Sequence, residues 1–120
     1  MGQFVLGRCY SEGVGVAQDD AEAARLYRLA AAQGYAGALS NLGYMFDEGL
    51  GVAQDYAEAV RLYRLAAAQG YAGAQSNLGV MFENGRGVAQ DRAEAIRWYR
   101  LAAAQGDAIA SAALNRLGAA

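Results

Sequence analysis

The chain has 120 residues, of which 55% are apolar, and its 12 acidic and 10 basic side chains leave a net charge of −2. This length suffices for one domain with a modest core, and the charge balance gives no electrostatic footprint for nucleic acid or for an anionic membrane. Histidine, lysine, proline and threonine are absent from the sequence, which excludes imidazole and Schiff-base catalysis and histidine-bound metals. We therefore expect no catalytic residue, no cofactor and no bound metal.

Cysteine usage and hydropathy narrow the class of protein further. Cys9 is the single cysteine, so it cannot form an internal disulfide, and its ordinary role is that of a small buried residue. No stretch approaches the ~18 apolar residues of a membrane helix. Residues 1–13 lack the basic region and apolar core of a signal peptide. We expect no membrane insertion and a cytoplasmic chain as it stands, or a periplasmic or secreted one if a signal was trimmed.

In chain order, the main feature is an internal repeat with a period of 36 residues. The phrases GVGVAQDDAEA, GLGVAQDYAEA and GRGVAQDRAEA begin at Gly13, Gly49 and Gly85. Aligned without gaps, residues 38–73 and 74–109 differ at ten positions, and residues 2–37 and 38–73 differ at eleven. A fixed period of this size indicates a solenoid of stacked units. We expect one domain over 1–120, with repeats 2–37, 38–73 and 74–109 and a capping helix at 110–118.

Each repeat is expected to begin with an amphipathic helix. In the second repeat, Ala38, Leu42, Met45 and Phe46 lie at i, i+4, i+7 and i+8, which places them on one helical face. Gly49 follows this stripe, and a glycine at this position is a common helix terminator. The sequence therefore predicts that the first helix ends at the glycine turn.

A second helix follows the turn. Asp55 is a good N-cap, and Glu58 three residues later completes a capping-box pattern. The other repeats carry the same pair, Asp19 with Glu22 and Asp91 with Glu94. A buried stripe begins at Ala59 with spacing i, i+3, i+4 and i+7, and Gly70 lies where the helix should stop. Each unit is thus predicted to be helix, glycine turn, helix, glycine turn.

The G-x-G turn has a second interpretation, a phosphate-binding loop. Such a loop follows a strand and has a third glycine, G-x-G-x-x-G. Here a predicted helix precedes the turn, and Gln18, Gln54 and Gln90 stand in place of the third glycine. The pattern therefore favours a structural turn.

The residues named above resemble the Sel1-like repeat family, which is related to the tetratricopeptide repeats. The second unit matches the family pattern at Leu42-Gly43, Phe46, Gly49, Gly51-Val52, Asp55, Ala59, Leu62-Tyr63, Ala66-Ala67 and Gly70. The third matches from Leu78-Gly79 to Gly106, and the first from Leu6-Gly7 to Gly34. The resemblance spans about nine-tenths of the chain and implies an all-α, right-handed α/α superhelical solenoid.

The two ends of the array differ from its middle. The tail continues in phase with a first helix, and we expect Leu114 and Leu117 to cover the exposed face of the last unit. Phe4 and Val5 replace polar residues of the next unit. They indicate local cover, a missing preceding repeat or a self-association surface. End-to-end association through Phe4 and Val5, or through Leu114 and Leu117, remains open.

The resemblance implies a scaffold that holds a peptide or partner protein on a concave surface lined by the first helix of each unit. Carried onto this sequence, that surface comprises Arg8, Ser11, Glu12, Ser40, Tyr44, Asp47, Glu48, Ser76, Val80, Glu83 and Asn84, with Phe4 at its N-terminal end. The resemblance does not identify the partner.

Four of these residues are carboxylates near the C-terminal end of a first helix: Glu12, Asp47, Glu48 and Glu83. Carboxylates are unfavourable at that end of a helix dipole, so helix stability does not explain them. One hypothesis is that they favour a basic peptide segment, with Tyr44 as an aromatic contact. The alternative is an ordinary solvated face.

Two rival functions follow from the same residues. Cysteine-rich relatives are associated with β-lactam binding or cleavage, but this chain has no lysine or histidine to activate a serine, so we expect no enzyme. A structural, engineered or self-assembling repeat module without a natural ligand is the other alternative. The arginine-only basic residues and the retained Cys9 favour a natural sequence, of bacterial origin.

Overall fold

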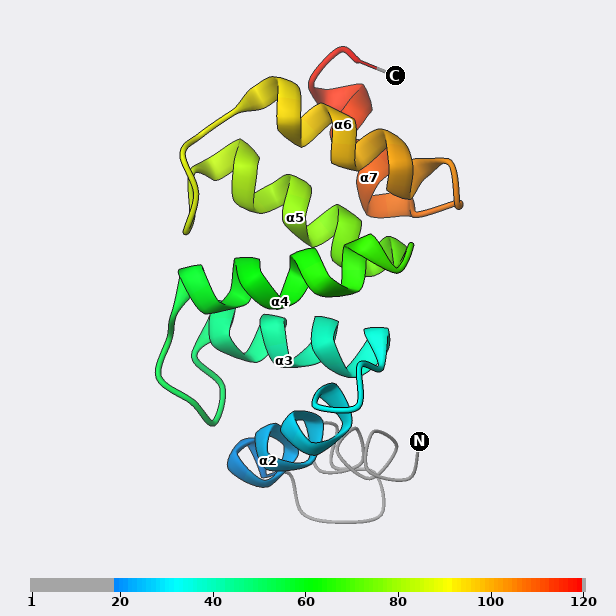
Figure 1. Cartoon of the computed structure of the whole chain (residues 1–120). Helices are drawn as coiled ribbons and strands as arrows, with labels where there is room; N and C mark the ends of the chain where they lie inside the picture. The colour runs from blue at the N-terminus through cyan, green and yellow to red at the C-terminus, as the bar shows by residue number, and fades with distance from the viewer. Residues whose placement is uncertain (1–18, 120) are drawn as a thin grey trace.

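A computed structural model describes residues 19–119, and within this range the regular secondary structure is all α-helix, joined by turns (Figure 1). The helices are α2 (Asp20–Ala31), α3 (Ala36–Glu48), α4 (Tyr56–Ala68), α5 (Ala72–Asn84), α6 (Arg92–Ala103) and α7 (Ala108–Arg116). Each helix packs against the next one from α2 to α6, and α7 lies beside α6 at the C-terminal end (Figure 1). This confirms the predicted all-α solenoid with a terminal cap. No helix in this part of the chain is long and apolar enough to cross a membrane.

The second helix of each repeat starts at the predicted aspartate. Asp19, Asp55 and Asp91 each accept a hydrogen bond at 3.1 Å from the backbone N–H of the glutamate three residues on. The reciprocal half of a capping box is absent at Asp55, because its own N–H already donates to the carbonyl of Phe46 at 2.9 Å. Glu58 instead accepts from Arg61 at 2.6 Å. Its carboxylate thus stabilises the outer face of α4 and not the cap.

The two glycines of the G-x-G turn have different structural roles. Gly85 ends α5 in the left-handed region, and the next residue, Arg86, donates back to the carbonyl of Met81 at 3.0 Å. Gly87 also has a positive φ, +71°, and a Cβ placed on it would lie 2.5 Å from the carbonyl oxygen of Tyr56. The second glycine therefore lets the turn of one repeat touch the start of the preceding repeat's second helix.

Pairing within a repeat depends on a tyrosine packed onto a glycine. Tyr63 and Tyr99 are fully buried. A Cβ on Gly43 would lie 2.8 Å from the Tyr63 ring, and one on Gly79 would lie 2.7 Å from the Tyr99 ring. Small residues at these positions thus let the first and second helices approach closely enough to bury a ring between them.

Neighbouring repeats are also joined by hydrogen bonds. The Gln69 side chain donates to the carbonyl of Gly34, and Gln105 donates to that of Gly70, each at 2.9 Å. Both bonds span 35 residues. Because their donors and their acceptors are equivalent residues of successive repeats, the same bond forms at each boundary. They satisfy backbone carbonyls in the turn that follows the preceding unit's second helix.

The C-terminal helix covers the last repeat. Leu114 is buried in the common core, and Leu117 packs against it. The Arg92 side chain donates to the carbonyl of Leu117 at 2.6 Å, which fixes the end of the cap to α6. Leu114 and Leu117 thus lie against the last repeat as expected, and end-to-end association through them stays a prediction. Phe4, Val5 and Cys9 lie outside the described residues.

Candidate functional site

The expected partner surface is only partly exposed. Tyr44, Glu48 and Asn84 are exposed, and Val80 and Glu83 are partly so. Ser40, Asp47 and Ser76 are 4%, 9% and 2% exposed, contrary to their expected surface positions. A helix inside the stack packs against several neighbouring helices. It therefore has fewer exposed positions than a surface helix with one buried face and one exposed face. Arg8, Ser11 and Glu12 lie outside the described residues.

Asp47 faces inward, near the C-terminal end of α3. Its Oδ2 accepts a hydrogen bond from the Tyr63 hydroxyl at 3.3 Å, whereas Oδ1 is buried without a hydrogen-bond partner. Burial raises the pKa of this carboxyl above its ordinary value, and the nearby charge of Glu48 adds to the shift. Burial next to Asp47 also raises the pKa of the Tyr63 hydroxyl.

Glu83 occupies the equivalent position in the next repeat, but it is fully paired. It accepts from the Tyr99 hydroxyl at 2.7 Å and from both terminal nitrogens of Arg116 at 2.6 and 2.8 Å. The hydrogen bonds from Arg116 hold the pKa of this carboxyl below its ordinary value. Of the four expected carboxylates, Asp47 is thus recessed, Glu83 is neutralised within the chain, and Glu48 is exposed.

A groove of about 580 Å³ lies on the same side of the stack, between α5 and α7. Its lining residues are Val80, Glu83, Asn84, Tyr99, Ile109, Ala112, Ala113 and Arg116. Ile109 is 65% exposed, the most exposed large apolar side chain of the described residues. We call Tyr44, Glu48, Val80, Asn84 and Ile109 the helix-one surface.

The residues from α7 were missed by the sequence reasoning, although a signal was present. Ile109, Ala112 and Arg116 lie 36 residues after Gly73, Ser76 and Val80. Because Ser76 and Val80 belong to the expected surface, carrying the repeat one unit further would have placed Ala112 and Arg116 on it, but not Ile109.

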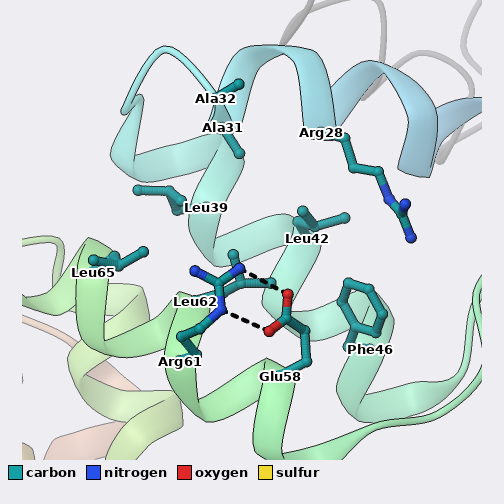
Figure 2. Close-up of a pocket in the computed structure, with 10 residues that line it drawn as sticks. All are labelled: Arg28, Ala31, Ala32, Leu39, Leu42, Phe46, Glu58, Arg61, Leu62 and Leu65. Carbon is teal, nitrogen blue, oxygen red and sulfur yellow. Dashed lines mark hydrogen bonds and ion pairs between the residues drawn. The ribbon is translucent and has the colours of Figure 1, made fainter.

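A second groove, of about 340 Å³, lies between α2 and α4 with α3 as its floor (Figure 2). Leu39, Leu42 and Phe46 line the floor. The Glu58–Arg61 ion pair and Arg28 lie at its rim, with the Arg28 guanidinium 5.5 Å from the Phe46 ring centre (Figure 2). This groove was not expected from the sequence.

The next repeat does not reproduce that apolar lining. Gln75 and Trp98 replace Leu39 and Leu62, and Gln75 is tied by hydrogen bonds to Gln105 and to the carbonyl of Ala67.

One feature does recur on the second helices, the exposed leucines Leu29, Leu65 and Leu101. We call these three residues the leucine row.

Within residues 19–119, no group of three or more histidine, cysteine, aspartate or glutamate side chains could hold a metal ion. The polar contacts described above are hydrogen bonds and ion pairs within the chain. The arrangement is suited to binding through apolar, aromatic and charged side chains at the surface.

The raised pKa of Asp47 predicts how stability depends on pH. The folded-state pKa lies above the unfolded value of about 3.9, so the folded chain binds the proton more tightly than the unfolded chain. The contribution of this group to the free energy of unfolding is therefore lost as pH rises from the unfolded-state to the folded-state pKa. Asp47→Asn is therefore expected to be more stable than the parent at neutral pH. The difference should shrink as pH falls through the folded-state pKa toward about 4, and it should stay constant below that value.

Urea denaturation of both proteins at several pH values checks this. The opposite effect of Glu83, whose pKa is lowered, is common to both and cancels in the comparison. A difference in the free energy of unfolding that does not change with pH would show that Asp47 keeps its ordinary pKa in the fold.

A protein-family model and solved structures both match this chain. A Sel1 repeat model matches residues 1–35, 36–71 and 72–107, the second and third matches beginning two residues before the expected repeat boundaries. No curated protein sequence matches the chain.

Two solved structures are similar to the chain over most of its length. One is a protective antigen of uropathogenic Escherichia coli with an SLR fold, which has 43% identity and a TM-score of 0.90 over 97% of this chain. The other is a Sel1 repeat protein from Oxalobacter formigenes, with 39% identity and a TM-score of 0.84 over 90%. This chain spans 24% and 44% of their lengths. Both are bacterial proteins, which fits the expected bacterial origin. Together with the three family matches, these similarities show that the chain belongs to the Sel1 repeat family.

Proposed function

We propose that the chain is a non-enzymatic interaction scaffold that binds a peptide or partner segment along the helix-one surface. Sel1 repeats generally mediate protein–protein interactions, and scaffolds of this kind are generally non-enzymatic. The observation that carries the proposal is the groove between α5 and α7, which brings Val80, Asn84 and the exposed Ile109 together. Tyr44 extends this surface one repeat toward the N-terminus.

The composition of this surface suits a peptide. Tyr44 offers an aromatic ring that is 48% exposed, and aromatic side chains are common energetic centres of interfaces. The apolar side chains lie beside polar ones, as in a mixed interface. Four of the ten differences between repeats two and three fall on this side, at Tyr44, Asp47, Glu48 and Gly73, which is where a scaffold would vary to fit a particular ligand.

The finer proposal is that the segment is basic. Glu48 is exposed at the end of α3, beside the recessed Asp47. With Glu83 already paired to Arg116, the charge available to a ligand is concentrated at these two residues. We therefore expect Arg/Lys-rich peptides to bind better than Asp/Glu-rich peptides of equal length.

Fluorescence anisotropy with such labelled peptides tests the proposal. Tyr44→Ala should weaken binding of the basic peptide by roughly 5- to 30-fold, as loss of a central aromatic contact costs about 1–2 kcal/mol. Leu65→Ala is the matched control, because Leu65 is 46% exposed but belongs to the leucine row. Equal binding of both peptide classes would refute the basic preference. Loss of binding only in Leu65→Ala would place the site on the other side of the stack.

A further inference from the structure

One carboxylate of the array, Glu83, already binds a cationic side chain of the same chain. At the α5–α7 boundary, Glu83 is held by the Tyr99 hydroxyl and by the two terminal nitrogens of Arg116. The guanidinium comes from the next first helix, 33 residues later. Such fork-shaped, two-point pairing is among the stronger hydrogen-bonded arrangements in proteins.

One repeat earlier, the same arrangement lacks its cation. Asp47 takes the place of Glu83, and Tyr63 donates to it as Tyr99 does to Glu83. The residue 33 positions after Asp47 is Val80, a partly buried apolar side chain packed against the core. Asp47 Oδ1 accordingly has no hydrogen-bond partner.

On this basis, which rests on the proposed function, we propose that Asp47 is the subsite for a cationic side chain of the bound segment, filling the place that Arg116 fills at Glu83. A buried carboxylate oxygen without a partner is costly, and a hydrogen-bonded cation relieves that cost. Glu48 lies beside the site and adds negative charge. Arg86 also acts electrostatically on Asp47, but its guanidinium lies over the Tyr56 ring, 5.7 Å from the centre.

The depth of the site selects the kind of cation. Aspartate is one methylene shorter than glutamate, and Asp47 is 9% exposed, so the ligand must reach it with a long, thin side chain. Arginine fits best, because its planar fork can reproduce the two-point contact that Arg116 makes with Glu83. Lysine can supply the charge without that geometry.

Val80→Arg tests the proposal, because it places the chain's own guanidinium at the register of Arg116. The variant should unfold at a higher temperature than the parent and bind an arginine-rich peptide roughly tenfold or more weakly. Val80→Met is the matched control, since it adds length without charge. The probe is a labelled nine-residue peptide with three arginines, and its counterpart carries neutral citrulline at the same positions.

A reciprocal variant provides a second test of the subsite. Arg116→Met removes the internal cation and exposes Glu83, so it should strengthen binding of the arginine peptide and leave the citrulline peptide unchanged. If the parent and Val80→Arg bind the arginine peptide equally, the subsite is refuted while the scaffold function stands. If the parent binds neither peptide, the proposed function fails and the subsite with it.

Discussion

Replacing Gly87 with alanine is expected to lower the free energy of unfolding by about 2–5 kcal/mol. Two costs combine at this position. The φ angle of +71° is unfavourable for a residue with a side chain, and the added Cβ would lie 2.5 Å from the carbonyl oxygen of Tyr56. Because that oxygen belongs to the backbone of the preceding repeat, relief of the clash requires the two repeats to separate. Urea denaturation followed by circular dichroism measures the effect.

Gly70→Ala separates the two costs. Gly70 has a φ of +85°, but nothing lies within 4 Å of the Cβ position, so only the backbone penalty of about 1–2 kcal/mol applies. The excess in Gly87→Ala is then the cost of pushing the repeats apart. Equal losses in the two variants would show that the second glycine of the turn serves its conformation alone and does not join neighbouring repeats.

Tyr63→Ala is expected to cost about 3–5 kcal/mol, the usual loss when a large buried ring is deleted. Tyr63 is fully buried and packs against Gly43, which has no side chain with which to fill the space. In a linear array each unit is stabilised by its neighbours. A damaged central unit should therefore also broaden the unfolding transition by uncoupling the two ends, which the same denaturation experiment detects.

Tyr63→Phe is the control for that prediction. It keeps the ring and removes only the hydroxyl, whose hydrogen bond to Asp47 is long at 3.3 Å. Its cost should be the smaller one, about 1–3 kcal/mol, because it leaves the buried Asp47 carboxylate without this partner but creates no large cavity. A loss in Tyr63→Ala no larger than in Tyr63→Phe would contradict the packing of this ring between the two helices of the repeat.

The helices and turns could be predicted from sequence because they are set by local interactions. The Asp55 cap acts over three residues, and the glycine that ends each first helix is fixed by the conformation of one residue. A gap-free period of 36 residues then makes stacking the natural way to bury each apolar stripe. These features required no knowledge of how the repeats lie in space.

The candidate surface was harder to predict because it depends on contacts between repeats. Asp47 and Ser76 are polar residues on helices that were expected to have a free outer side, yet both are buried by the stack. The pairing of Glu83 with Arg116 spans 33 residues, and it arises from two replacements at equivalent positions, Asp47 by Glu83 and Val80 by Arg116. Such point differences within a near-identical repeat reveal their effect only when the neighbouring unit is in place.

The most direct test of the central claim is the location of the bound peptide, measured by titrating the isotope-labelled protein with the arginine-rich peptide and following amide chemical shifts. The scaffold proposal predicts that the largest shifts fall on α3, α5 and α7, around Tyr44, Val80 and Ile109, with little change at the leucine row. Shifts concentrated around Leu29, Leu65 and Leu101 would contradict it.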